Sequence, residues 1–451
     1  MSGNFQFFSQ SPLFLSGKSV VERLRDAGYS AYFVGGCVRD MLSGKVPGDI
    51  DIATSATPEQ INRIFPKTHN SGISFGVVTV HQDGFLFETA TYRKECGYTD
   101  GRHPGETVYT DSPEEDVARR DFTINGLLLD PVSGEILDFV GGLKDLRAGI
   151  IRTIGAGDLR FREDALRILR AVRFHARFRF PLEESTEAAA RRNAKNLLHL
   201  SAERVRMELE MMLTGPNPEQ AFRTLEKLCA LEIILPEVSV MNRVEQPPEF
   251  HPEGNVFEHT AIMLGKMRKP SPALAWSVLL HDVGKPETFR IHGDGKIHFY
   301  GHEAVGEKMA ISILQRLRCS RELTALVSKA VRDHMRFTQV EQMRRSTLRR
   351  LIAEKHFPVT LELIRLDCAS CHGKMDSYLH LIDFLREFQD QPAVPEPLLT
   401  GNDLIRMGFS PGPNMGRILR KVMDMQLEGK FKNKSEALTY CRKTFLRNIQ
   451  S

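Results

Sequence analysis

The sequence has no apolar run approaching the roughly 20 residues that cross a bilayer, so it predicts no membrane-spanning segment. Its seven cysteines are odd in number and irregularly spaced, which does not fit a disulfide framework. The chain does not open with a basic segment followed by an apolar one, as an export signal would. From these absences we expect a protein of the reducing cytoplasm that does not enter a membrane.

Net charge is also scarce. The formal value is +4, which is too small by itself to indicate nucleic-acid binding. The positive charge is instead concentrated in two stretches. Residues 160–179 hold seven arginines against two acidic residues, and residues 411–451 hold nine lysines and arginines against three acidic ones. We expect each stretch to form a basic surface that an RNA backbone can contact.

The chain is long enough for several folded units. Between about residues 20 and 150, short β-type runs alternate with helical stretches. After Gly157 the β signal fades and a 3.6-residue periodicity dominates. The pattern predicts an α+β unit followed by helical units. Two proline-rich stretches, residues 244–254 and 391–397, are interpreted as linkers.

A glycine pair and two aspartates indicate phosphate and metal binding in the first unit. Gly35 and Gly36 follow a β-type run and can bring backbone N–H groups close to a phosphate, while Arg39 adds a positive charge. Asp49 and Asp51 lie two residues apart on an expected strand, so both carboxylates point to one face and can share Mg²⁺ ions. Nucleotidyl transfer needs that arrangement. Either motif alone is more often a plain turn or strand end, but the combination is much less common.

A third carboxylate is possible in the same unit. Glu88, on a β-type run, could be a further metal ligand or could pair with Arg93, so the predicted catalytic site uses Asp49 and Asp51 only.

Residues 119–125 add polar groups to this site. Arg119 and Arg120 can hold phosphate oxygens, and Asp121 and Asn125 can reach a ribose hydroxyl. As an isolated string, the segment could also be an ordinary ion-pair cluster on the surface.

Residues 161–174 predict one helix with a base-reading face. Apolar residues recur at helical spacing, while Asp164, Arg167 and Arg170 step along an adjoining face. A carboxylate accepts hydrogen bonds from the exocyclic amines of cytosine and adenine, and it repels the carbonyl that uracil or guanine presents there. Arg167 supplies the complementary donors. An isolated Asp-x-x-Arg pair would more often be a simple ion pair on a helix surface.

Four motifs occur in a characteristic order: Gly-Gly-x-x-Arg-Asp, Asp-x-Asp, Arg-Arg-Asp-Phe-Thr-Ile-Asn and Glu-Asp-x-x-Arg. In this order they resemble the class II tRNA nucleotidyltransferase and bacterial poly(A) polymerase family, which includes CCA-adding enzymes. The resemblance spans residues 32–236. It implies Mg²⁺-dependent transfer of CMP and AMP from CTP and ATP to the 3′ end of a tRNA. It also implies metal ligation by Asp49 and Asp51, and nucleotide contacts from Gly36, Arg39, Arg120, Asp164, Arg167, Arg170 and Arg173.

The resemblance to this family does not determine which nucleotides are added. Residues 94–116 resemble the flexible loop that family members need for adding the terminal A, which favours CCA or A addition. Poly(A) polymerases share the Glu-Asp-x-x-Arg segment, so poly(A) addition to general RNA is an alternative. A non-catalytic RNA-binding protein is disfavoured, because this candidate metal site and a second one, described next, both keep their ligand types.

A second metal site is predicted downstream. A helix expected over residues 273–281 ends in His281 and Asp282, with Gly284 as the helix stop and a proline just beyond. With His259 and Asp367, this pair resembles the His, His-Asp, Asp set of the HD phosphohydrolase superfamily.

The expected ligands can be extended and suggest particular metals. His302 and His334 could complete a two-metal version of the site. Imidazole with carboxylate suits Mn²⁺, Fe²⁺, Co²⁺ or Ni²⁺ better than Ca²⁺. A phosphodiesterase or phosphatase as the main activity is therefore an alternative of another class.

These expectations give an α+β fold. A polymerase-β-like α/β nucleotidyltransferase head occupies residues 20–153, and all-α parts follow it. They are a nucleotide-selecting neck and body at residues 154–243, an HD domain at residues 251–376 and a basic, tRNA-binding tail at residues 398–451.

Overall fold

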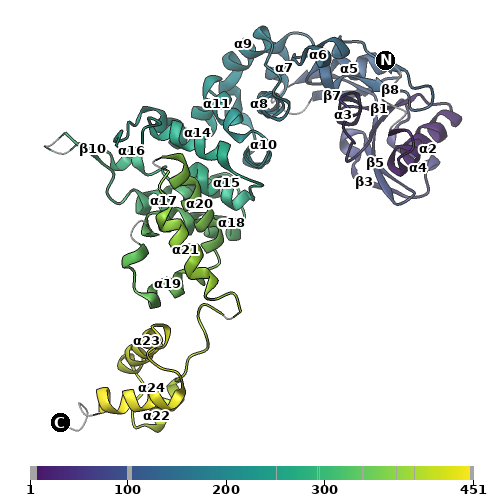
Figure 1. Ribbon diagram of the computed structural model, residues 1–451. Helices are drawn as coiled ribbons and strands as arrows, with labels where there is room; N and C mark the ends of the chain where they lie inside the picture. Colours follow the sequence, from purple (N-terminus) through teal and green to yellow (C-terminus); the bar gives the residue numbers. More distant parts are fainter. Residues whose placement is uncertain are drawn as a thin grey trace. The chain divides into compact units, whose positions relative to one another are not determined.

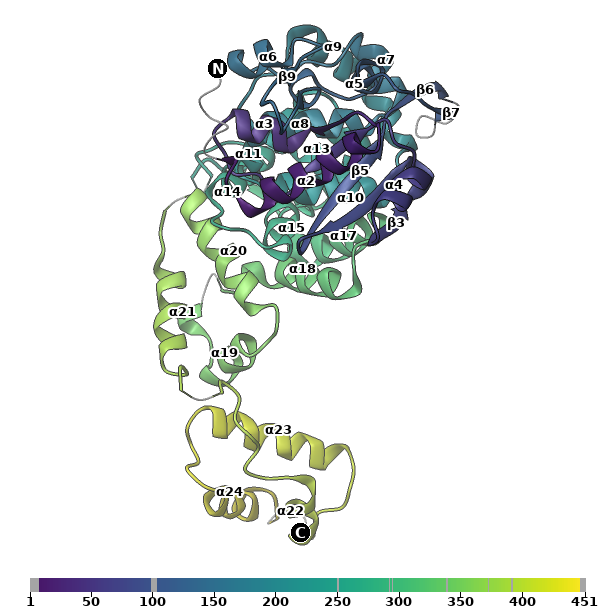
Figure 2. The same cartoon turned by 90° about the vertical axis from the view of Figure 1, so that its right-hand side faces the viewer.

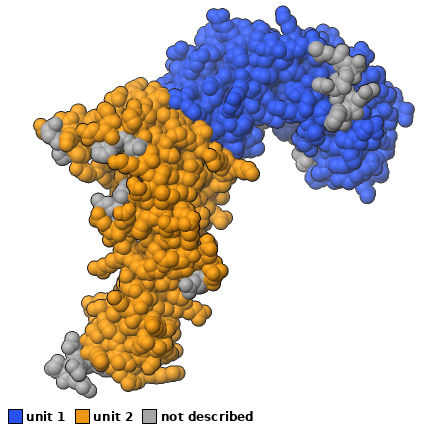
Figure 3. Space-filling model, viewed as in Figure 1, with its two compact units in different colours: residues 1–236 blue, residues 237–451 orange. Residues whose placement is uncertain are grey.

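The structure is a computed structural model that describes residues 8–98, 104–249, 251–291, 293, 295–337, 340–371, 373–390 and 392–446. The chain forms two compact units, residues 1–236 and 237–451 (Figure 3). Within the described ranges, no helix combines the length and apolar character needed to cross a membrane. Part of the expected loop, residues 99–103, lies outside the described residues.

A seven-stranded sheet forms the head, in the order β3-β4-β5-β2-β1-β8-β9. Its strands are β1 (Ala31–Val34), β2 (Asp51–Thr54), β3 (Thr68–Gly72), β4 (Val77–Gln82), β5 (Phe85–Thr91), β8 (Leu128–Leu129) and β9 (Ile136–Leu137). Strands β2 and β5 are parallel, with Ile52 opposite Thr89, and the other neighbours are antiparallel. A separate antiparallel pair, β6 (Arg93–Tyr98) and β7 (Pro104–Tyr109), occupies the region of the expected loop.

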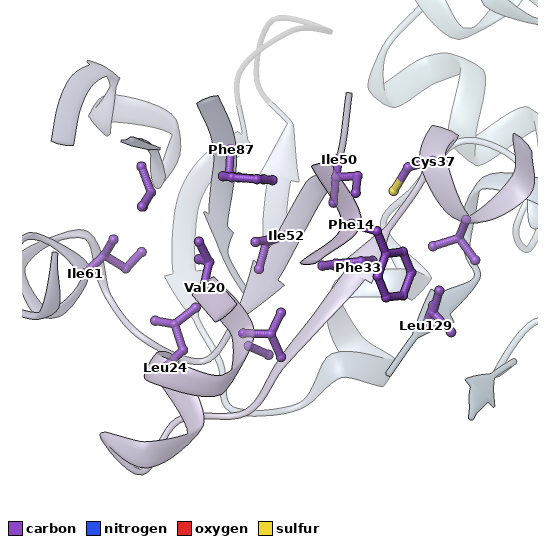
Figure 4. Packing of buried hydrophobic residues seen from close by; sticks show 14 of the residues in the cluster. Phe14, Val20, Leu24, Phe33, Cys37, Ile50, Ile52, Ile61, Phe87 and Leu129 are labelled. Carbon is purple, nitrogen blue, oxygen red and sulfur yellow. The ribbon is translucent and has the colours of Figure 1, made fainter. Parts of the chain in front are cut away.

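The head core includes residues that precede its predicted start. Helix α2 (Pro12–Asp26) packs against β1, β2, β4 and β5. The Phe14 ring meets the Phe33 ring edge to face at 5.3 Å (Figure 4). Phe8 is buried in the same cluster. The head therefore starts before residue 20, because the apolar face of α2 completes the core.

Among the described residues the head also contains the short helices α3 (Gly36–Leu42), α4 (Pro58–Ile64), η1 (Ile73–Phe75), α5 (Pro113–Ala118), η2 (Thr123–Asn125) and α6 (Gly142–Ala148). The rest of the first unit is helical, as expected from its 3.6-residue periodicity. Its elements are α7 (Gly157–Glu163), α8 (Leu166–Phe178), α9 (Glu184–Asn193), η3 (Ala194–His199), α10 (Ala202–Leu213), α11 (Pro218–Lys227) and α12 (Leu231–Ile234).

The prediction of a single helix over residues 161–174 is wrong. It is broken at Asp164, whose backbone is extended with φ −146° and ψ 104°. The Asp164 carboxylate accepts a hydrogen bond from the Leu166 backbone N–H at 3.0 Å. Aspartate often interrupts a helix in this way, because its side chain competes for backbone donors. Asp164 and Arg167 therefore do not lie on one continuous helical face.

The second unit is also helical. Its longer helices are α14 (Val256–Lys266), α15 (Pro272–Leu280), α17 (His302–Arg316), α18 (Arg321–Asp333), α19 (Arg345–Ile352), α20 (Phe357–Ser370) and α21 (Asp376–Arg386). Between α15 and α17 lie the short helix α16 (Lys285–Thr288) and the hairpin β10 (Arg290–Ile291) and β11 (Ile297–His298). Side chains of α19, α20 and α21 share one apolar cluster, which reaches past the predicted boundary at residue 376.

The C-terminal helices have a core of their own. Helices α22 (Gly401–Arg406), α23 (Pro413–Leu427) and α24 (Lys434–Cys441) lie side by side in both views (Figures 1 and 2). Leu399, Leu404, Val422, Ala437 and Cys441 are buried between them. Helix α23 also packs against α19, where Arg350 donates to Asp424, so these helices belong to the second compact unit.

Candidate functional site

A cavity of about 770 Å³ in the first unit is lined by head residues and by the N-terminal half of the helical part. All the site residues predicted for the head and neck lie in its wall: Gly35, Gly36, Arg39, Asp49, Asp51, Arg120, Asp121, Asn125, Asp164, Arg167, Arg170 and Arg173. Segments separated by more than a hundred residues of sequence thus meet around one space.

Gly35 makes the turn between β1 and α3. Its φ is +76°, a left-handed value that favours glycine, whereas Gly36 begins α3 in an ordinary helical conformation. A Cβ atom at Gly35 would lie 3.8 Å from Arg120 Nη1 and 4.0 Å from Asp51 Oδ2. The turn therefore brings backbone of the cavity wall, a cation and a carboxylate together. The positive φ expected at both glycines occurs at Gly35 alone.

Asp49 and Asp51 line the cavity, and a third carboxylate, Glu88, lies near enough to Asp51 to influence its pKa. Asp51 is the first residue of β2, and Glu88 lies on the parallel neighbour β5. Asp49 lies two residues before the strand, so the expectation that both aspartates lie on one strand is wrong. Burial, together with repulsion from Asp49 and then Glu88, raises the pKa of the Asp51 carboxyl to about 6, although Arg120 opposes the rise. Mutual repulsion of this kind is relieved by a bound cation, and carboxylate oxygens are the ligands that Mg²⁺ prefers. The donor set fits that metal.

Hydrogen bonds link the head to helix α8. Arg39 donates to Asp40 Oδ1 at 2.8 Å and to Asn125 Oδ1 at 2.5 Å. Asn125 donates to Asp121 Oδ1 at 3.0 Å, and Arg170 donates to Asp121 Oδ2 at 2.7 Å. Although burial raises it, the pKa of Asp121 is lowered by Arg170 and Asn125. Asp121 and Asn125, expected at a ribose, are thus engaged in holding two cavity arginines.

Arg119 and Arg120 are both held by Asp116, a residue that does not line the cavity. Asp116, only 1% exposed, lies 2.6 Å from Arg119 Nη2 and 2.9 Å from Arg120 Nη2. The two oxygens of one buried carboxylate therefore orient both guanidinium groups.

The Asp164 and Arg167 side chains are held by neighbours on other helices. Arg204 of α10 donates to Asp164 Oδ2 at 2.7 Å. Arg167 donates to Glu163 Oε2, to Arg160 O and to Arg119 O. Since a guanidinium has five N–H donors, two donors of Arg167 are left over among the described contacts. No sequence pattern indicated Arg204, because its proximity to Asp164 depends on the packing of α8 against α10.

Five of the seven arginines of residues 160–179 are paired with acidic residues and do not form the open basic surface that we expected. Arg160, Arg167, Arg170, Arg173 and Arg177 each have a carboxylate oxygen at 3.2 Å or closer. Four of the five, all except Arg160, also line the cavity. Their charge is therefore directed to a nucleotide-sized space and partly compensated there, because buried arginines need carboxylate partners.

The second unit brings all the predicted HD residues together. His259 Nε2 lies 3.1 Å from Asp367 Oδ1, and His281 Nε2 lies 3.1 Å from Asp282 Oδ2. On the other side of Asp282, Oδ1 lies 3.4 Å from His302 Nε2 and 3.8 Å from His334 Nε2. Asp282 thus joins two groups of possible metal ligands. These groups come from α14, the end of α15, α17, the end of α18, and α20.

The hydrogen bonds of these histidines fit a cation. In His281, His302 and His334, Nδ1 lies 2.8, 2.8 and 2.6 Å from a backbone carbonyl. A carbonyl only accepts, so Nδ1 carries the proton and the Nε2 lone pair faces the centre. Burial and the nearby His281 lower the pKa of His334 to about 3, which keeps that imidazole neutral. Converging lone pairs and carboxylates need a positive charge between them, as a metal supplies.

His251 and Glu253 also belong to this cluster, although the sequence reading missed them. Both lie in residues 244–254, which we interpreted as a linker because of its prolines. Glu253 Oε1 lies 2.9 Å from His251 Nδ1 and 2.6 Å from His259 Nδ1. The spacing of His251 and Glu253 before His259 was the available signal.

Gly284 has a different role from the helix stop that we predicted. Its φ is −82°, and α15 ends four residues earlier at Leu280. A Cβ atom at Gly284 would lie 2.2 Å from His302 O and 2.7 Å from Gly306 N. Glycine is required here because the start of α17, which carries His302, packs directly on the backbone.

Known families match both units. The Poly A polymerase head domain matches residues 31–152, and the family described as "Probable RNA and SrmB- binding site of polymerase A" matches residues 179–241. In the second unit, residues 302–441 match tRNA nucleotidyltransferase domain 2.

Individual relatives extend the similarity to nearly the whole chain. A CCA-adding enzyme of Leuconostoc mesenteroides is 32% identical over 434 residues, which cover 96% of this chain and 97% of the relative. A CCA-adding enzyme of Geobacillus kaustophilus is 45% identical over 214 residues, 48% of this chain and 53% of the relative. The crystal structure of the Bacillus stearothermophilus CCA-adding enzyme in complex with CTP has a TM-score of 0.74 at 27% identity, and the match covers 97% of this chain and 100% of that one.

The close packing at Gly284 generates a stability prediction. Gly284→Ala should lower the free energy of unfolding of the second unit by about 1–3 kcal/mol, because the added methyl group has no space. Urea denaturation followed by fluorescence of the single, buried Trp276 measures it. Gly293→Ala is the control, since a Cβ atom there meets nothing within 4 Å. Equal unfolding midpoints for both variants would contradict the packing argument.

Proposed function

This chain belongs to the family of CCA-adding enzymes, and from that premise we propose that it adds CMP and AMP from CTP and ATP to the 3′ end of tRNA in the cavity of its first unit. One observation carries the proposal. The Asp49 and Asp51 carboxylates lie in the wall of an arginine-lined cavity that also contains Asp164 and Arg167, and burial together with their mutual repulsion raises the pKa of Asp51. The Bacillus stearothermophilus relative was crystallised with CTP, which supports this use of the cavity.

Asp49 and Asp51, with Glu88 as the third carboxylate, are proposed to hold divalent metal ions, typically Mg²⁺ in this family. When bound, Mg²⁺ lowers the pKa of an attacking 3′-hydroxyl and neutralises charge on the departing pyrophosphate. The protein supplies the remaining requirements. The Gly35 turn lets backbone approach the triphosphate, and Arg120, fixed by Asp116, lies beside that turn. In-line transfer depends mainly on such positioning and on compensation of charge.

Asp164 and Arg167 are proposed to select the base. The Asp164 oxygens already accept from Leu166 N–H and Arg204, and each keeps a lone pair for the amino group of cytosine or adenine. Arg167 lines the same cavity, and its two remaining donors can serve a ring nitrogen. Because Arg204, Glu163 and backbone carbonyls fix both side chains, their orientation does not depend on the bound nucleotide.

Substrate choice tests the proposed activity. Wild-type protein is incubated with tRNA lacking CCA, tRNA ending in C and tRNA ending in CC, each with labelled CTP or ATP. We expect CTP to extend the first two and ATP to extend the third. Acceptance of the CC-ended tRNA alone would indicate an A-adding enzyme. Equal extension of an unstructured RNA would instead favour poly(A) addition.

Asp51→Asn should nearly abolish incorporation in this assay. The substitution keeps the size of the side chain but removes one of the carboxylates in the proposed metal set, a loss of several kcal/mol that corresponds to about a thousandfold in rate. Asp83→Asn is the control, because Asp83 is exposed in the same head and its φ of +50° suits asparagine. Normal incorporation by Asp51→Asn would refute the assignment of the metal ligands.

Asp164→Ala should retain nucleotide transfer but admit UTP. Loss of the carboxylate should lower the preference for CTP over UTP by about 10- to 100-fold, the usual worth of a specific base contact. Competition between labelled CTP and UTP in single-turnover incorporation measures this preference. Asp158→Ala removes an aspartate of the preceding helix that lies outside the cavity, and it should leave the preference unchanged. Unaltered selectivity in Asp164→Ala would exclude a base-reading role.

A second candidate function belongs to the other unit. We propose that His259, His281, Asp282, Asp367, His302 and His334 hold divalent transition metals such as Mn²⁺, Ni²⁺ or Co²⁺ and hydrolyse phosphate esters. The supporting observation is the convergence of imidazole Nε2 atoms on two carboxylates. A metal bound by such ligands supplies a water nucleophile of lowered pKa. Lys285 Nζ, 2.7 Å from Asp282 Oδ2, is the nearby cation that can contact a substrate phosphate.

His281→Ala should separate the two activities. We expect loss of bound transition metal, measured by mass spectrometry of the purified protein, and loss of hydrolysis of bis(p-nitrophenyl) phosphate. Nucleotide addition should stay at the wild-type rate, because its site lies in the first unit. His380→Ala, at an exposed position of the same unit, is the control. Unchanged metal content in His281→Ala would contradict the metal centre.

A further inference from the structure

The four histidines of the proposed metal centre are not held alike. His281, His302 and His334 each direct Nδ1 to a neutral backbone carbonyl, of Val278, Phe299 and Val331 respectively. His259 instead directs Nδ1 to a carboxylate, Glu253 Oε1, at 2.6 Å. One end of the centre is therefore supported by a carboxylate within hydrogen-bond distance. At the other end the nearest carboxylate oxygen to an Nδ1 atom in the described contacts is Glu303 Oε2, 3.8 Å from His302 Nδ1, which is too far for a hydrogen bond.

Glu253 is itself held in place. Its Oε1 also receives His251 Nδ1 at 2.9 Å, and its Oε2 is buried without a hydrogen-bond partner among the described residues. The Glu253 side chain is only 6% exposed and His259 is fully buried, so water does not screen the interaction. A carboxylate in this position is preorganised to fix the orientation of His259.

A carboxylate that accepts a hydrogen bond from one imidazole nitrogen makes the other nitrogen a stronger metal ligand. Glu253 holds the proton on Nδ1 of His259 and leaves Nε2 directed at the centre, where Asp367 Oδ1 lies 3.1 Å away. Its negative charge also makes Nε2 a better electron donor than a carbonyl would. Lys285 compensates Asp282, but Asp367 and Glu253 remain as additional negative charge at the His259 end.

The opposite end lacks this support. At that end, Asp282 Oδ1 is the carboxylate oxygen near His302 Nε2 and His334 Nε2. These two nitrogens lie 3.2 Å apart. We propose that Glu253, held by His251, is a positioning residue that makes the His259 end of the centre the tighter of two divalent-metal sites bridged by Asp282. The inference rests on the proposed metal centre of the second unit.

Calorimetric titration of the metal-free full-length protein with Ni²⁺ tests the proposal. Ni²⁺ favours imidazole over the all-carboxylate site of the head, which excess Mg²⁺ keeps filled. Wild type should bind Ni²⁺ in a tight step and a weaker step. In Glu253→Gln the tight step should weaken by about 10- to 100-fold while the weak step is unchanged, as for loss of an outer-shell carboxylate. His302→Ala should show the reverse pattern.

Glu249→Gln is the matched control, because it removes the same charge from an exposed position of the same segment. It should leave both steps unchanged. Thermal unfolding of the metal-free variants shows whether they fold. If Glu253→Gln does not fold, His251→Ala, which removes the second donor to Glu253, should still weaken the tight step selectively.

The outcomes distinguish this inference from the function on which it rests. If Glu253→Gln, or His251→Ala in its place, binds as wild type does or weakens both steps equally, the positioning role is overturned. If wild type binds no Ni²⁺ in either step, the metal centre of the proposed second function fails, and this inference fails with it.

Discussion

The buried hydrogen-bond chain from Asp40 through Arg39, Asn125 and Asp121 to Arg170 is the interaction on which the first unit depends. It begins at the glycine turn of the head and ends on helix α8. These hydrogen bonds connect the head, which carries the carboxylates, to α8, which carries Arg167. The charged groups of this hydrogen-bond chain can be taken out of water because each one has a hydrogen-bond partner, with the Asn125 amide joining Arg39 to Asp121.

Charge compensation explains the rest of that cavity. Asp116, Glu163 and Glu208 are acidic residues that contact no proposed ligand, yet each one fixes an arginine of the wall. The exception is the group of Asp49, Asp51 and Glu88, in which like charges accumulate and the pKa of Asp51 rises. A site that is compensated everywhere except at one cluster of carboxylates is suited to a cation at that cluster.

The second unit solves a similar problem with different groups. There, backbone carbonyls and one carboxylate fix the histidine protons on Nδ1 and direct the other nitrogens to Asp282 and Asp367. The glycine at position 284 allows α17 to approach closely enough for His302 to join them. In both units, therefore, the site side chains are oriented by hydrogen bonds to groups that do not themselves contact the proposed nucleotide or metal.

The sequence alone determined the α+β head, the helical remainder and the residue types of both sites, because glycine turns, paired aspartates and His-Asp motifs are local chemical patterns. Poly(A) or CCA addition remained open at that stage. Only the tertiary structure joined Glu88 to Asp51 through the parallel pairing of β2 and β5, and Arg204 to Asp164 through helix packing. It also broke the expected helix at Asp164 and moved His251 and Glu253 from a linker into the cluster of possible metal ligands around His259. Periodicity and spacing describe one segment at a time, whereas these contacts arise between segments that only the folded core brings together.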